Sequence, residues 1–307
     1  MPTLPRRAAL LALPALLAAR SALAQRPAPR PAEVITDPRV ETFALRATPE
    51  AEPWRIFLGR PAQPAPAGGF PVLFLLDGNA TFPLAWHAQE MAPGATPAVL
   101  VGIGYPVADS FDIRRRFYDL TPETAAEYLQ GRAEPPRTGG QDALLDAITG
   151  PLRAEVARRL PVDAGRQALF GHSLGGLCAL HAFFTRPEAF GTVIAADPSI
   201  WWNNRSILQE QAGFLAGLRA AGGKLNPGIR LLIANSGQRP PRPAGSNPGP
   251  GMAGPGGRET AQALRAVAGL TLRYRHMAEE THGSMLPGAV QDALRFFAGD
   301  DGVGEPV

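Results

Sequence analysis

Apolar residues in this 307-residue chain gather in short uninterrupted runs instead of alternating with polar residues. Strands that helices cover on both faces carry such runs, whereas half-exposed strands alternate between apolar and polar positions. The pattern therefore predicts a series of buried strands. They are 40–47, 52–61, 70–79, 97–106, 167–173, 191–199, 229–237 and 270–277.

Several longer segments between these runs carry apolar residues at the spacing of a helix. They predict helices over 141–160, 174–187 and 284–299. Strands that alternate with helices are typical of a mostly parallel central sheet with helices on both faces. We therefore predict one α/β domain and place its boundaries at 39–300.

Segments outside this pattern have a composition of their own. Residues 1–24 combine a basic start, an apolar centre and a small-residue end, the layout of an export signal peptide cleaved after Ala24. Arg6 and Arg7 leave both the general secretory and the twin-arginine route open. The apolar centre is too short and too interrupted to span a membrane. The other segments are an extended tether at 25–38, a proline- and glycine-rich loop at 239–257 and a tail at 301–307.

The charge balance changes once the signal is set aside. Residues 1–24 hold three arginines and no acidic residue, so the formal net charge of +3 becomes zero for the rest of the chain. A neutral chain argues against a nucleic-acid partner. Cys178 is the single cysteine, which excludes an intrachain disulfide, and the five histidines form no ligand pair for a metal. We expect no metal, no cofactor and a periplasmic or secreted location.

The segment from Leu169 to Leu177 reads LFGHSLGGL and lies between a predicted strand and a predicted helix. Gly171-x-Ser173-x-Gly175 at such a junction is the nucleophile-elbow pattern, in which a strained turn raises a serine hydroxyl above the end of a strand. The next helix directs its free amide groups and its positive dipole end to the same place. A plain tight turn is the alternative, but the junction favours a nucleophile at Ser173.

A serine nucleophile needs a base, which in this arrangement follows the last strand. His282 stands between the last predicted strand and the last predicted helix, so it is the candidate base. His276 is an alternative that falls within the strand pattern. The remaining histidines precede or adjoin the serine and are expected to be structural: His87, His172 and His181.

Two backbone N–H groups are needed to bind the negative charge that develops on an ester oxygen. Leu174, directly after the nucleophile, is the candidate for one of them. Asn79, in the turn after the apolar run VLFLLDG, is the candidate for the other. The composition of this turn also allows a plain turn with no such role.

A string of motifs runs along the chain: FPVLFLLDGNATF, LVGIGYP, RRFYDLTP, GGQDALLDAI, LRAEVARRLPVD, LFGHSLGGL, DPSIWWNN and EETHGSMLP. Together they resemble the esterase D-like branch of the α/β-hydrolases, and within it the exported or periplasmic esterases of trilactone siderophores. The resemblance covers roughly residues 40–299. It implies an α/β-hydrolase fold, catalysis by Ser173 and His282, and an oxyanion hole formed by Asn79 and Leu174.

The chain departs from that family in its acid. Relatives often carry a carboxylate after the strand that corresponds to IRLLIA, whereas this chain reads NSGQRPPRPAG there. We therefore predict that His282 works without an acid from residues 235–257, in a Ser–His dyad whose imidazole is held by a backbone carbonyl or water. Asp197 is the candidate acid of a triad, and Glu279 and Glu280 are further candidates for which a surface role is the simpler interpretation. The proline- and glycine-rich loop is predicted to be mobile and to border the substrate entrance.

Three residues are candidates for substrate binding. Arg116 matches an arginine of the family and could hold a carboxylate or catecholate through its guanidinium, or else form an ion pair, for example with Asp119. Trp201 and Trp202 could line an aromatic pocket near the serine, or at least one of them belongs to the core.

The leading hypothesis is a serine esterase that cleaves a small-molecule carboxylic ester through an acyl-enzyme, with a siderophore trilactone as a candidate substrate. One alternative is a general carboxylesterase or acyltransferase that acts on feruloyl or acyl-sugar esters. Another is a secreted binding protein on a hydrolase scaffold. A substrate panel separates the two enzymes, and labelling by a fluorophosphonate separates both from the binding protein.

Overall fold

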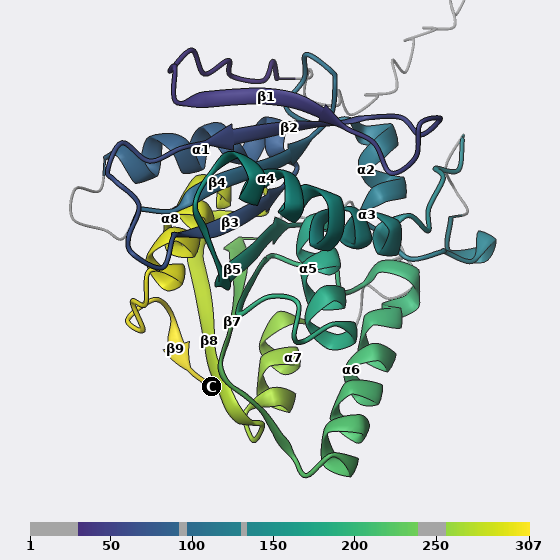
Figure 1. The fold of residues 1–307 in the computed structure, drawn as a ribbon. Helices are drawn as coiled ribbons and strands as arrows, with labels where there is room; N and C mark the ends of the chain where they lie inside the picture. The colour runs from purple at the N-terminus through teal and green to yellow at the C-terminus, as the bar shows by residue number, and fades with distance from the viewer. Residues whose placement is uncertain (1–29, 92–96, 130–133, 239–255) are drawn as a thin grey trace, which may run out of the picture.

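The computed structural model describes residues 30–91, 97–129, 134–238 and 256–307. Within these ranges a nine-stranded sheet runs through the molecule in the order β1-β2-β4-β3-β5-β6-β7-β8-β9 (Figure 1). The strands from β4 through β3 to β8 pair in parallel, while β2 and β9 pair antiparallel with their neighbours. The strands are β1 Val40–Leu45, β2 Trp54–Gly59, β3 Phe70–Leu76, β4 Val99–Gly104, β5 Val162–His172, β6 Thr192–Ala196, β7 Lys224–Gln238, β8 Ala268–Thr281 and β9 Glu305–Pro306.

Helices cover both faces of this sheet, which confirms the predicted α/β architecture. Phe82 and Trp86 of α1 share a buried cluster with Phe296 of α8 on one face. The other face packs against α3, α4, α5, α6 and α7. The helices are α1 Gly78–Glu90, α2 Ile113–Asp119, α3 Gln141–Ala147, α4 Arg153–Arg159, α5 Leu174–Thr185, α6 Trp202–Ala220, α7 Gly257–Leu264 and α8 Leu286–Phe297, with a 3-10 turn η1 at Ala126–Leu129 and a π-helical turn η2 at Ile148–Leu152.

Every predicted strand falls on an observed strand, whereas the helices agree less well. The helix predicted over 141–160 is divided into α3, η2 and α4, with Pro151 inside the π-helical turn. The sequence pattern missed α1, α2, α6 and α7. For α1 the reason is an interior Pro83 and burial on more than one side, which together remove the usual contrast between an apolar and a polar face.

Four predicted segments need correction or fall at least partly outside the described residues. The tether at 25–38 is not free throughout, because Pro31 forms a bridge with Asp109. In the loop at 239–257, residues 239–255 lie outside the described residues, and α7 already begins at Gly257. The tail at 301–307 contains β9, which pairs with β8. The predicted export signal at 1–24 also lies outside the described residues.

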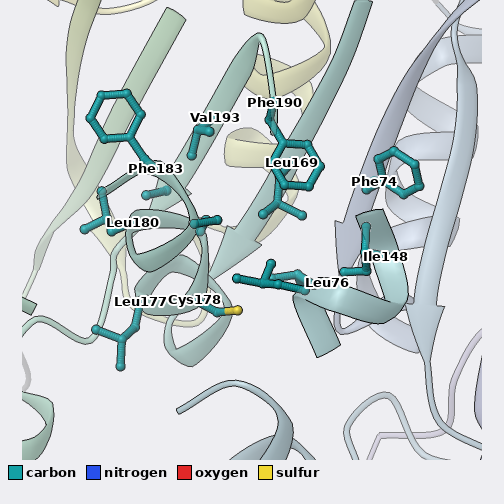
Figure 2. Close-up of a cluster of buried hydrophobic side chains, with 14 of the residues drawn as sticks. Phe74, Leu76, Ile148, Leu169, Leu177, Cys178, Leu180, Phe183, Phe190 and Val193 are labelled. Atoms are coloured by element: carbon teal, nitrogen blue, oxygen red, sulfur yellow. The ribbon is translucent and has the colours of Figure 1, made fainter. Parts of the chain in front are cut away.

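The hydrophobic core between α5 and the sheet supports the strand end that carries the serine turn. Figure 2 shows side chains of α5 packed with those of β3, β5, β6 and η2. Cys178 is fully buried there, in the role of a small apolar residue, as its position predicted. None of the helices in the described residues is long and apolar enough to cross a membrane.

Candidate active site

Ser173 lies on a sharp turn between β5 and α5. Its φ of 63° and ψ of −117° lie in a region that residues other than glycine rarely adopt. A Cβ added to Gly171 would lie 2.0 Å from the carbonyl oxygen of Gly175, and one added to Gly176 would lie 2.9 Å from that of Ala196. Close approach of the backbone therefore requires glycine at 171 and 176. At position 175 the nearest atom would be 3.4 Å away, so this second glycine of the motif is less constrained.

His282 follows β8 and reaches across the sheet to Ser173. Its Nε2 lies 3.0 Å from Ser173 Oγ, and its Nδ1 lies 2.7 Å from Asp197 Oδ2. The side chain of His282 is 48% exposed, whereas that of Asp197 is 3% exposed. In this geometry the imidazole can take a proton from the hydroxyl while a carboxylate stabilises the cation that forms.

The contact between Asp197 and His282 differs from the predicted dyad, in which a backbone carbonyl or water holds the imidazole. Asp197 directly follows β6, and in the sheet only β7 separates β6 from β8. Its left-handed backbone, with φ of 39°, makes a sharp turn at the end of the strand. Burial raises the pKa of this carboxyl, but hydrogen bonds from His282, Ser236 and Asn235 outweigh burial and hold the pKa below its usual range.

The other candidates for the acid and the base lie elsewhere. Glu280 hydrogen-bonds with Ser284 Oγ, and Glu279 is exposed. In the described part of the chain, neither glutamate forms a hydrogen bond with the ring of His282. His276 is exposed on β8, where it pairs in register with Asn235.

His172, predicted to be structural, contacts the candidate base directly. Its Nε2 lies 2.8 Å from the carbonyl oxygen of His282, and the two ring centroids are 4.6 Å apart. Burial, with smaller contributions from the charges of His282 and Arg116, lowers the pKa of His172 to about 4. The neutral ring therefore donates its Nε2 hydrogen to the carbonyl and holds the backbone of the base. Its place beside Ser173 in the motif was the signal that could have indicated this contact.

The two remaining histidines stay outside the site. His181 is buried on α5, with Glu210 and Asp142 on its two ring nitrogens. His87 forms a surface contact with Glu33. Within the described residues no group of three or more His, Cys, Asp and Glu side chains is arranged to hold a metal ion.

The two candidate oxyanion amides lie in the first turns of helices. Leu174 is the first residue of α5, and Asn79 is the second residue of α1. N–H groups in a first turn have no acceptor within their helix, so they are available to other groups. The Asn79 side chain fixes the start of α1, because its Oδ1 accepts a hydrogen bond of 2.8 Å from the Tyr105 N–H. The expected turn at Asn79 is therefore a helix start anchored to the loop after β4.

Arg116 forms an ion pair, but its partner is Asp77 and not Asp119. Its Nη2 lies 2.9 Å from Asp77 Oδ2, and its Nε lies 3.1 Å from Asp77 Oδ1. Arg115 takes the place beside Asp119 instead, at 3.2 Å. A Cβ added to Gly175 would lie 3.6 Å from Asp77 Oδ2, so the Arg116–Asp77 pair borders the first turn of α5.

The two adjacent tryptophans have different surroundings. Trp202 is 3% exposed, and its Nε1 donates a hydrogen bond of 2.8 Å to Thr124 Oγ1. It therefore belongs to the core and does not line an open pocket. Trp201 is 39% exposed. It follows Ser199 by two residues, and Ser199 Oγ lies 3.5 Å from Ser173 Oγ.

Known proteins that resemble this chain are named as esterases. The family model described as "Putative esterase" matches residues 52–224. The ferri-bacillibactin esterase BesA of Bacillus subtilis is 34% identical over 278 residues, which are 87% of this chain and 92% of BesA. A siderophore enterobactin esterase of Emericella nidulans is 42% identical over 180 residues, which are 55% of this chain and 59% of that protein.

A solved structure is similar to this chain over most of its length. The BES protein from Bacillus cereus superposes with a TM-score of 0.73 at 29% identity, over 86% of this chain and 97% of that one. The fold is therefore an α/β-hydrolase fold, with a mostly parallel central sheet covered by helices on both faces. Because the family model spans more than half of the chain and BesA aligns along most of its length, this protein belongs to the putative esterase family.

Proposed function

We propose that this protein is a serine esterase that hydrolyses the ester bonds of a lactone siderophore, with Ser173, His282 and Asp197 as its catalytic triad. One observation carries the proposal: the His282 ring bridges Ser173 Oγ at 3.0 Å and Asp197 Oδ2 at 2.7 Å. The substrate class is transferred from relatives named as siderophore esterases.

The proposed reaction has two halves. Ser173 Oγ attacks the ester carbonyl carbon while His282 Nε2 takes the hydroxyl proton, and the same proton passes to the departing alcohol. Water then attacks the acyl-enzyme with His282 as the base, which releases the acid and restores the serine. The N–H groups of Leu174 and Asn79 are proposed to bind the negative oxygen in both tetrahedral intermediates.

We propose substrate-binding roles for Trp201, at the start of α6, and Arg116, on α2. Trp201, exposed and close in sequence to Ser199, is proposed to stack on an aromatic arm of the substrate. Arg116 is proposed to supply positive charge for a catecholate or carboxylate. Asp77 already binds two of its nitrogens, so this contribution is electrostatic and smaller than that of an unpaired arginine.

Covalent labelling tests the enzyme proposal. A fluorophosphonate should add to the folded protein with a stoichiometry of one, and mass spectrometry should place the adduct on Ser173. Ser173→Ala should abolish both the labelling and the turnover of p-nitrophenyl butyrate. A folded wild-type protein without an adduct would favour a binding protein on a hydrolase scaffold.

A substrate panel tests the substrate class. We expect a higher kcat/KM for a catecholate trilactone, in its ferric or iron-free form, than for p-nitrophenyl butyrate, a feruloyl ester or an acyl sugar. Equal or better activity on the feruloyl or acyl-sugar esters would indicate a general carboxylesterase or an acyltransferase. We also propose that residues 1–24 direct export, and N-terminal sequencing of the mature protein from the periplasm or medium tests this.

A further inference from the structure

Asp197 is surrounded by hydrogen-bond donors that the reaction scheme does not use. Ser236 Oγ donates to Asp197 Oδ2 at 2.6 Å, and Asn235 Nδ2 donates to Oδ1 at 2.9 Å. The N–H of Ser236 donates to Oδ1 at 3.4 Å. The N–H of Asp197 itself donates to the Ala234 carbonyl oxygen at 2.7 Å. All of these contacts come from the end of β7.

The order of the strands explains why donors stand at this place. Asp197 follows β6 and His282 follows β8, while β7 lies between those strands. The carboxylate must therefore extend past the end of β7 to reach the imidazole. A carboxylate on β7 would repel it at short range, whereas a hydroxyl and an amide stabilise its charge. The uncharged residues at positions 235 and 236 fit this requirement.

The side chains at this end of β7 have little freedom. Ser236 is 5% exposed. A Cβ added to Gly257, the first residue of α7, would lie 2.0 Å from Asn235 Oδ1. The Asn235 amide is therefore confined between α7 on one side and Asp197 on the other. Such confinement keeps its Nδ2 group directed at the carboxylate.

From these contacts we infer that Ser236 and Asn235 are positioning residues that hold Asp197 in the orientation required by His282. The inference rests on the proposed function, because it concerns the acid of the same triad. Asp197 has an unfavourable left-handed backbone, with φ of 39°, and such a conformation persists only where surrounding contacts hold the residue in place. Ser236 binds Oδ2, the same oxygen that faces His282 Nδ1, and thereby sets the direction of that hydrogen bond.

A double-mutant cycle tests the inference. Ser236→Ala should lower kcat for p-nitrophenyl butyrate roughly 10–100-fold, the effect of losing one hydrogen bond to a charged group, with little change in KM. Ser236→Ala should cause no further loss in the Asp197→Asn background, because Ser236 acts through the carboxylate. Thr192→Ala, which removes a buried hydroxyl at the opposite end of β6, is the matched control and should leave kcat unchanged.

Two results would overturn the inference. One is an unchanged kcat in Ser236→Ala, and the other is an equal fold-loss from Ser236→Ala with and without the Asp197 carboxylate. If Ser236→Ala does not fold, Asn235→Ala enters the same cycle with the same expectations. Fluorophosphonate labelling of the wild type separates the failures: a labelled, active wild type with an additive cycle contradicts this inference alone, whereas an unlabelled wild type contradicts the proposed function as well.

Discussion

Two histidine–carboxylate clusters with different properties lie along helix α5, one at its start and one about two turns further on. At its start, His282 contacts Asp197 through Nδ1 and Ser173 through Nε2, and its side chain is 48% exposed. Further along, His181 contacts Glu210 through Nδ1 at 2.7 Å and Asp142 through Nε2 at 3.1 Å. The side chain of His181 is only 8% exposed.

The difference shows which features turn a histidine–carboxylate contact into a base. Burial lowers the pKa of His181, but hydrogen bonds and charges from Glu210 and Asp142 outweigh burial and raise it. With a carboxylate on each ring nitrogen, His181 has both nitrogens engaged, so neither is available to take a proton from a hydroxyl. His282 has one carboxylate, an adjacent hydroxyl and access to solvent, which proton transfer to a substrate requires. We expect His181 to tie α5 to α3 and α6 instead.

The largest expected effect is a loss of kcat on removing the charge of Asp197, with no such loss for Glu210. Asp197→Asn should lower kcat by roughly 10³–10⁴-fold, as the loss of a triad acid does, because the imidazolium loses its stabilising charge. Glu210→Gln should leave kcat unchanged although it alters the same kind of contact. Steady-state kinetics with p-nitrophenyl butyrate on both folded variants provides the measurement. A loss below about tenfold in Asp197→Asn would restore the Ser–His dyad.

The next largest effect is a pH dependence of folding stability caused by His172, which packs against His282. Burial lowers the pKa of His172 from 6.5 to about 4, so between these values the unfolded chain takes up a proton that the folded chain does not. The folded state should therefore lose stability as pH falls from 6.5 towards 4, by up to about 3 kcal/mol. Urea unfolding at a series of pH values measures this loss. The slope should be shallower in His172→Gln, and equal slopes for both proteins would contradict the assignment.

For His181 we expect a smaller pH dependence of folding stability, with the opposite sign to that of His172. Its pKa is raised in the folded state, so its stabilising contribution is complete below the unfolded value of about 6.5 and is lost as pH rises through the folded pKa. The stability advantage of the wild type over His181→Gln should therefore shrink as pH rises above that value, while kcat of the variant stays unchanged. A stability difference that grows with pH, or a large loss of kcat, would show that the two clusters are not separate.

The smallest effect is expected at Cys178, which lies on α5 between the clusters. Burial raises the pKa of its thiol well above the usual range, so almost no thiolate forms near neutral pH. Iodoacetamide should leave the native protein unmodified and active, while the urea-unfolded chain should take up one label. Rapid labelling of the native protein would mean that α5 opens more readily than its packing indicates.

The sequence alone was sufficient for the features that depend on neighbouring residues. Continuous apolar runs located the strands, because a strand buried on both faces has no polar side to alternate with. The turn at Ser173 was predictable from Gly171-x-Ser173-x-Gly175 at the junction of a predicted strand and a predicted helix. The proposed base, His282, followed from its order in the chain, after the last long strand.

Tertiary structure alone decided which groups surround that histidine. In the sequence, nothing distinguishes Asp197 from an acid on the surface. In the fold, β6, β7 and β8 lie side by side, and Asp197 Oδ2 comes within 2.7 Å of His282 Nδ1. The donors on β7 follow from the same adjacency, and the contact from His172 depends in addition on β5 lying beside β6. The pairing of Arg116 with Asp77 also joins residues 39 positions apart. Hydrogen bonds between distant segments depend on strand order and register, and no local pattern of polar and apolar residues records either of them.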